Sequence, residues 1–117
     1  MVLYVLVHEH CIWEEYVHLL QQGRSLGRIP SILQELQRIR IHEPFVEVRG
    51  DPHKVLYSLQ DKVLVCGAYG EMCVRNHVLA LHAMGQVVDY HDKGILFAQR
   101  DLLLPLPAVD FCYMSDD

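Results

Sequence analysis

The stretch from Lys62 to Gly85, KVLVCGAYGEMCVRNHVLALHAMG, decides the fold of this chain. It opens with Lys62–Cys66, an apolar run typical of strands that are buried on both faces. Gly67–Gly70 ends that run, and residues 71–84 return to a helical pattern that stops at Gly85. A buried strand, a glycine-bearing turn and a helix in this order indicate one unit of an α/β domain.

The segments on either side continue the alternation of strand and helix. Val2–Val7 is a second continuous apolar run, and helical patterns are expected at residues 12–22, 32–39 and 53–60. Three further short strands are expected at Phe45–Val48, Val87–Tyr90 and Ile95–Phe97. Near-continuous apolar strands separated by helices predict a three-layer α/β/α fold, with a mostly parallel sheet and helices on both faces.

Length and composition favour a single domain over residues 1–117. The chain has 117 residues, within the usual size of one domain, and 51% hydrophobic residues can supply its core. Fifteen Asp and Glu against ten Lys and Arg give a net charge of −5 without a basic block, so no nucleic acid is expected as a partner. The sequence contains neither the ~20 apolar residues of a transmembrane helix nor a signal peptide, so we expect a cytoplasmic protein without a membrane partner.

Three loops are expected to meet at one rim of the sheet. In parallel sheets, ligands bind beyond the carboxyl ends of the strands. The loops that follow the first three predicted strands are His8–Cys11, Arg49–His53 and Gly67–Cys73. They come from separate parts of the sequence, so their polar side chains are candidates for a shared site.

Cys73 is the strongest candidate for chemistry in these loops. It falls near the start of the predicted helix, where free backbone N–H groups and the positive helix end stabilise a thiolate. The same N–H groups could hold the oxyanion that forms when a thiolate attacks a carbonyl. His77, one helical turn later, could lie beside the thiol. The alternative is that Cys73 is a small packed residue and His77 lies on the surface.

Residues 63–92 resemble the signature of the isochorismatase-like cysteine hydrolases. An apolar strand, Gly67, a five-residue stretch, the pair Cys73–Val74, a helix ending at Gly85 and a further strand before Asp89 or Asp92 fall at matching offsets. The resemblance implies that Cys73 is the nucleophile. It also implies a cis peptide bond in the preceding turn and an oxyanion hole made there by backbone amides, with Ala68, Tyr69 and Met72 as the candidates.

The remaining catalytic positions depart from that family. The resemblance implies an aspartate at the end of the first strand, and this chain carries His8 or Glu9 there, either of which could accept a proton. It also implies a lysine after an intermediate strand, where Arg49 is the candidate and Lys54 or Lys62 are alternatives. Arginine keeps the positive charge but cannot shuttle a proton.

Metal binding is the other chemical interpretation of these loops. His8 and His10 would share a face if the first strand continued, and Asp51-Pro52-His53 resembles the metal-binding segment of nicotinamidases. The sequence contains no Cys-x-x-Cys or His-x-x-x-His pair to complete such a site. We therefore expect neither a metal nor another cofactor.

These observations lead to two expectations of function. The first is a hydrolase acting on a small amide or related carbonyl substrate through a cysteine nucleophile. The alternative is a catalytically inactive relative that serves as a binding or assembly module. In either case we expect a homodimer or higher homo-oligomer, because Leu102–Pro107 adds apolar surface that a small domain cannot cover.

Overall fold

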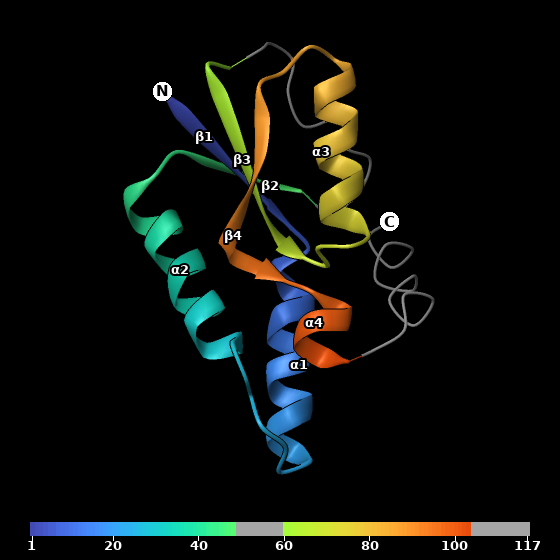
Figure 1. Cartoon of the computed structure of the whole chain (residues 1–117). Helices are drawn as coiled ribbons and strands as arrows, with labels where there is room; N and C mark the ends of the chain where they lie inside the picture. Colours follow the sequence, from blue (N-terminus) through green and yellow to red (C-terminus); the bar gives the residue numbers. More distant parts are fainter. Residues whose placement is uncertain (49–59, 104–117) are drawn as a thin grey trace.

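The structure is a computed structural model that describes residues 1–48 and 60–103 (Figure 1). Four strands form one all-parallel sheet in the order β2-β1-β3-β4. Their bounds are Val2–Val7 for β1, Phe45–Val48 for β2, Lys62–Ala68 for β3 and Val88–Leu96 for β4. This arrangement confirms the predicted α/β fold.

The two central strands, β1 and β3, hold the middle of the core. They pair in register from Val2 opposite Lys62 to Val7 opposite Gly67. The last four residues of β1 are buried on both faces, as are most residues of β3. Their continuous apolar runs are explained by this position, because a central strand of a parallel sheet has no solvent-facing side.

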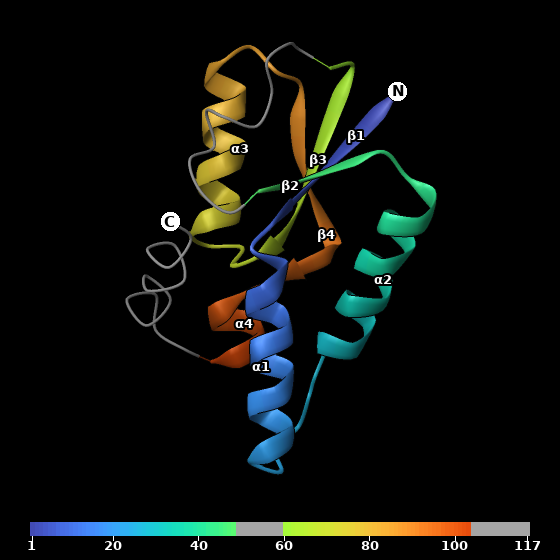
Figure 2. The ribbon, with the colours of Figure 1, turned by 180° about the vertical axis from the view of Figure 1, so that it is seen from behind.

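The helices α2 (Ile29–His42) and α3 (Cys73–Ala83) flank the sheet from opposite sides, as Figures 1 and 2 show. Helix α1 (Glu9–Gln21) begins directly after β1 and continues beyond the carboxyl end of the sheet. A short fourth helix, α4 (Ala98–Leu102), lies beside α1. Among the described residues, none of the helices has the length and apolar character needed to span a bilayer.

Strand β4 joins the two short strands that the sequence predicts near the end of the sheet. Val88–Tyr90 pairs with β3, and so do Ile95 and Leu96, but the register shifts between them. The residues between the paired segments include Gly94, where a Cβ atom would lie 2.9 Å from Cys66 Cβ. The glycine therefore lets the irregular part of β4 lie directly against the buried strand.

The helices differ from their predicted bounds mainly at the ends. α1 begins three residues earlier than expected, and α2 covers residues 29–42 rather than 32–39. The sequence does not predict α4, since its five residues carry too little pattern to be recognised. The helix expected at 53–60 lies outside the described residues except for Gln60, and of Leu102–Pro107 only Leu102 and Leu103 are described.

Candidate active site

The carboxyl ends of β1 and β3 bring two of the predicted site residues to one rim. His8 follows β1 directly, is almost fully buried, and has left-handed backbone angles of φ 49° and ψ 46°. Its N–H donates to the carbonyl of Val48 at 3.1 Å, which ties the end of β1 to the end of β2. Cys73 begins α3 after the turn that follows β3, as the sequence predicts.

Two glycines shape the turn between β3 and α3. Gly67 has φ +119°, and a Cβ atom there would lie 1.8 Å from the carbonyl oxygen of Val7. Only glycine fits this conformation and this close approach of two strands. A Cβ atom at Gly70 would lie 2.3 Å from the ring of Phe97. Both glycines are thus required by packing.

The predicted oxyanion residues lie in this turn. Ala68 ends β3, and its peptide bond to Tyr69 is cis, as the family resemblance implies. The N–H of Met72 donates to the Tyr69 carbonyl at 3.0 Å, and the N–H of Val74 donates to the same oxygen at 3.2 Å. The Met72 amide is therefore engaged within the turn.

The Tyr69 side chain connects the turn to α1. Its ring is buried, and its hydroxyl donates to Glu15 Oε1 at 3.2 Å. Burial raises the pKa of Tyr69, and the neighbouring Glu15 carboxylate raises it further, because both disfavour the phenolate. The phenol stays protonated and holds the turn against α1.

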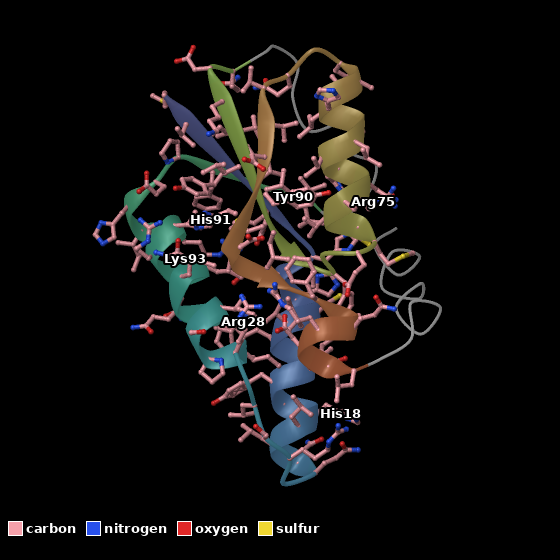
Figure 3. All side chains as sticks on the ribbon, viewed as in Figure 1. His18, Arg28, Arg75, Tyr90, His91 and Lys93 are labelled. Atoms are coloured by element: carbon pink, nitrogen blue, oxygen red, sulfur yellow. The ribbon has the colours of Figure 1, made fainter. Side chains whose placement is uncertain are left out.

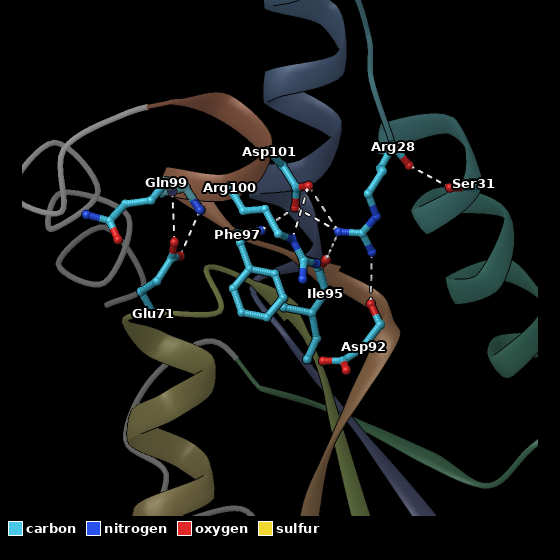
Figure 4. A network of polar contacts seen from close by, with 10 residues as sticks. Arg28, Ser31, Glu71, Asp92, Ile95, Phe97, Gln99, Arg100 and Asp101 are labelled. Carbon is cyan, nitrogen blue, oxygen red and sulfur yellow. Dashed lines mark hydrogen bonds and ion pairs between the residues drawn. The ribbon is translucent and has the colours of Figure 1, made fainter.

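A polar network anchors the same turn to the end of β4 (Figure 4). The Glu71 carboxylate accepts the N–H groups of Ala98 and Gln99, each at 2.8 Å, at the start of α4. Asp101 accepts the Phe97 N–H at 2.8 Å and both oxygens of its carboxylate are contacted by Arg28. Charge-assisted bonds of this kind are among the stronger hydrogen bonds. The start of α4 therefore holds Glu71, and with it the turn between β3 and α3, in place.

The two cysteines of the central motif are both buried, and neither forms a disulfide. Cys66 lies within β3, where burial raises the pKa of its thiol because the thiolate would lose its hydration. Cys73 lies at the first position of α3, where the helix dipole favours an anion. Both thiols are buried, and they differ in that only Cys73 lies at the start of a helix.

His77 is buried rather than exposed, so the expectation of a surface position is wrong. It belongs to the stripe of α3 that faces the sheet, together with Cys73, Val74, Val78 and Leu81. Its Nδ1 lies 2.7 Å from the carbonyl oxygen of Cys73, and its ring centroid is 6.4 Å from that of His8. The spacing of four residues in the sequence indicates that Cys73 and His77 could meet on one side of a helix. It does not indicate that this side faces the sheet.

Glu9 makes its contacts with other partners. Its Oε1 accepts a hydrogen bond from Arg40 Nε at 2.8 Å, and its Oε2 accepts one from Trp13 Nε1 at 3.3 Å. Arg40 also pairs with Glu47 on β2. Of the two candidates for the proton acceptor, His8 is the one in ring contact with His77, while Glu9 belongs to an ion-pair cluster between α1, α2 and β2.

Several predicted residues lie outside the described part of the chain. These are the candidate cation Arg49 with its alternative Lys54, and the metal-binding candidates Asp51 and His53. His10 is described, but it lies in α1 because the strand ends at Val7, and its ring centroid is 5.9 Å from that of His8. Within residues 1–48 and 60–103, no group of three or more His, Cys, Asp or Glu could hold a metal ion.

A separate pocket of about 460 Å³ lies between α2 and β4. Its ion pairs centre on Glu35, which contacts Arg38 at 2.8 Å and His91 at 2.5 Å. Figure 3 shows His91 and Lys93 on the side of β4 that faces α2. The Arg38 guanidinium, with a smaller contribution from His91, lowers the pKa of Glu35 to about 2. The sequence indicates only a solvated helix end at residues 37–43, because pairing with β4 cannot be read from α2 alone.

We compared the chain with protein families, curated proteins and solved structures, and none of them matches it. Inferences about function therefore depend on the residues at the rim of the sheet. A thiol at the start of α3, a buried imidazole one turn further along α3 and a second buried imidazole at the end of β1 can together supply a nucleophile and proton acceptors.

Proposed function

We propose that this protein is a cysteine-dependent hydrolase that acts on a small amide or related carbonyl substrate. The observation that carries the proposal is the cluster at the rim of the sheet. Cys73 starts α3, His77 binds the Cys73 carbonyl at 2.7 Å, and the His8 ring lies 6.4 Å from that of His77. The resemblance of residues 63–92 to the isochorismatase-like hydrolases supports the same role for Cys73.

The reaction would proceed through a covalent intermediate. His8 takes the proton of the Cys73 thiol, and the thiolate forms a bond to the carbonyl carbon of the substrate. The C–N bond then breaks, and the imidazolium returns its proton to the leaving amine. Water, losing a proton to the imidazole, attacks the thioester, and the acid leaves as the Cys73 thiol re-forms.

The charge that builds on the substrate oxygen needs donors near the turn. Backbone N–H groups at the start of α3 and the positive end of that helix are suited to this role. Arg49 is proposed as the nearby cation, by the same family resemblance. Neither a metal nor another cofactor is proposed for the reaction, and the substrate is a small molecule.

A binding or assembly module is the second candidate function. The observation that favours it is that Cys73 has no exposed surface. A thiol that stays covered cannot reach a substrate, and the cluster would then only pack the rim. The two candidates differ in one measurable property, the chemical reactivity of Cys73.

The test measures alkylation of each cysteine by iodoacetamide against pH, with the modified residues identified by mass spectrometry. We expect Cys73 to react faster than free cysteine at pH 7, since the helix dipole lowers thiol pKa values. Cys66 is the internal control, because burial raises the pKa of its thiol. Equal rates at Cys73 and Cys66 would reject the hydrolase and favour the binding module.

A second arm tests turnover directly with p-nitrophenyl acetate, a generic acyl donor. We expect an acetyl adduct on Cys73 that disappears on incubation with water, together with release of nitrophenol. Cys73→Ser should lose the rapid adduct, while Cys66→Ser should keep it. An adduct that forms equally in the Cys73→Ser protein would contradict the proposal.

A further inference from the structure

The hydrogen bond of His77 defines its tautomer. Its Nδ1 lies 2.7 Å from the carbonyl oxygen of Cys73, and a carbonyl oxygen can only accept. The proton must therefore be on Nδ1, so in the neutral ring the lone pair is on Nε2. His77 holds the first turn of α3 with one nitrogen while the other is basic.

The basic nitrogen of His77 lies inside the protein and near a second imidazole. The Nε2 atoms of both His77 and His8 are buried. The two rings are 6.4 Å apart between centroids and nearly perpendicular, with 85° between their planes. Two positive charges this close in a buried place repel each other, so protonation of one ring disfavours protonation of the other.

The other titratable groups at this rim come from α1, the β3–α3 turn and α3. His10 on α1 lies next to His8, with 5.9 Å between the ring centroids. Tyr69 on the turn is held protonated beside Glu15 of α1. Cys73 on α3 supplies the one group whose proton the mechanism moves.

We propose that His77 is a positioning residue for Cys73. It holds the Cys73 carbonyl in place through Nδ1–H. Its neutral ring is buried against His8, so the two imidazoles together can accept one proton. That proton comes from the Cys73 S–H bond and is carried on an imidazole nitrogen until the leaving amine takes it. The proposal rests on the proposed hydrolase, in which His8 is the base at the position of the family's aspartate and His77 acts through Cys73 and His8.

The test uses two substitutions that separate the two nitrogens of His77. In His77→Asn the side-chain amide can replace the Nδ1–H donor to Cys73, but the protein loses the basic ring. His77→Ala removes both. We expect His77→Asn to keep the stability of the wild-type protein, while Cys73 alkylation at pH 7 slows about tenfold and its pH midpoint rises by about one unit.

A purely structural role predicts a different result. In that case His77→Asn would keep both the stability and the alkylation profile of the wild-type protein, which would overturn the proposal. If wild-type Cys73 reacts no faster than Cys66, the proposed hydrolase fails instead. The two failures are therefore distinguishable.

A spectroscopic measurement tests the tautomer without relying on reactivity. Nitrogen-15 NMR of the histidine rings distinguishes a protonated from an unprotonated ring nitrogen. At pH 7 we expect His77 to carry its proton on Nδ1 and a lone pair on Nε2, and to titrate at higher pH in the His8→Asn variant. A His77 ring protonated on Nε2 would overturn the proposal, and so would a His77 titration that is unchanged in the His8→Asn variant. Either result would count regardless of the alkylation rate of Cys73.

Discussion

At the scale of single residues, His8 shows how the rim departs from ordinary backbone geometry. It is a non-glycine residue in the left-handed region, with φ 49°. Such a conformation costs about 1–2 kcal/mol and persists only where the surroundings enforce it. Here the Val48 carbonyl holds its N–H, and its ring is buried against His77. Strained backbone conformations are concentrated at functional sites, which supports a functional role for His8.

Gly67 is predicted to be the least replaceable of the glycines that the structure describes. Gly67→Ala would place a Cβ atom 1.8 Å from the Val7 carbonyl oxygen at φ +119°, so β1 and β3 would have to separate. We expect a loss of more than about 4 kcal/mol in the free energy of unfolding, measured by urea denaturation. Gly23→Ala is the matched control, since it also has positive φ but nothing within 4 Å. It should cost only about 1 kcal/mol, and equal losses would contradict the prediction.

The lowered pKa of Glu35 predicts that the protein loses stability at low pH, where this carboxylate is protonated. Its pKa is lowered from 4.5 to about 2 in the folded protein, chiefly by Arg38. A depressed folded pKa contributes stability above pH 4.5, and that contribution disappears as the pH falls through about 2. We expect about 1 kcal/mol after solvent screening, since Arg38 is largely exposed.

The Glu35→Gln variant should therefore lose less stability than the wild type between pH 4.5 and 2, as followed by urea midpoints at each pH. Glu14→Gln changes an exposed carboxylate on α1 and serves as the control. A Glu35→Gln curve parallel to that of the wild type would show that the ion pair contributes nothing.

Among single residues, the sequence could place Cys73 but not its neighbours. A cysteine after a strand, a glycine turn and a helical pattern is recognisable from local spacing alone. Whether His8 or Glu9 lies beside His77 could not be decided, because adjacent residues at a strand end diverge once the chain turns into α1. The choice depends on Arg40, which lies 31 residues away and binds Glu9.

At the scale of elements, α4 is stabilised by its own Asp101 and by Glu71, which lies 27 residues before Ala98 in the sequence. Its five residues are too few for an independent helix. Glu71 accepts the N–H groups of Ala98 and Gln99, and Asp101 accepts that of Phe97. This is why α4 could not be predicted, whereas the long apolar strands β1 and β3 could.

Glu71 is predicted to control the opening of α4. Glu71→Gln removes the negative charge from two charge-assisted bonds at the helix start, and we expect a local cost of about 1 kcal/mol. Amide hydrogen exchange at Ala98 and Gln99 should then become about fivefold faster. Asp92→Asn is the control, since it removes an equal charge nearby and the Asp92 carboxylate has no hydrogen-bond partner among the described residues. Equal exchange in both variants would refute the role of Glu71.

At the scale of the whole molecule, self-association is predicted to involve α1. Its outer face exposes Trp13, Val17 and Leu20 by 41%, 49% and 53%, at the spacing of one helical stripe. An apolar stripe of this kind on a small domain is suited to a second copy. We expect light scattering at micromolar concentration to give twice the monomer mass of 13.6 kDa.

Val17→Glu should convert the dimer to a monomer by placing a charge at the centre of the stripe. Leu79→Glu on α3 is the matched control, because Leu79 is 48% exposed but belongs to a different helix. A wild-type mass of 13.6 kDa would contradict the dimer, and dissociation by Leu79→Glu alone would move the interface to α3.

The anchoring of the Cys73 turn has a consequence for how the protein is made. A ribosome delivers β1, β2 and β3 before β4, so the central strands β1 and β3 can pair before the rest of the chain emerges. The bonds that hold Glu71 come from Ala98 and Gln99, and Gly70 is held by Leu96, so these contacts form only after β4 and the start of α4 have been synthesised. A nascent chain arrested before Ala98 would carry Cys73 behind an unanchored turn, and this rim would reach its final structure after the sheet that supports it.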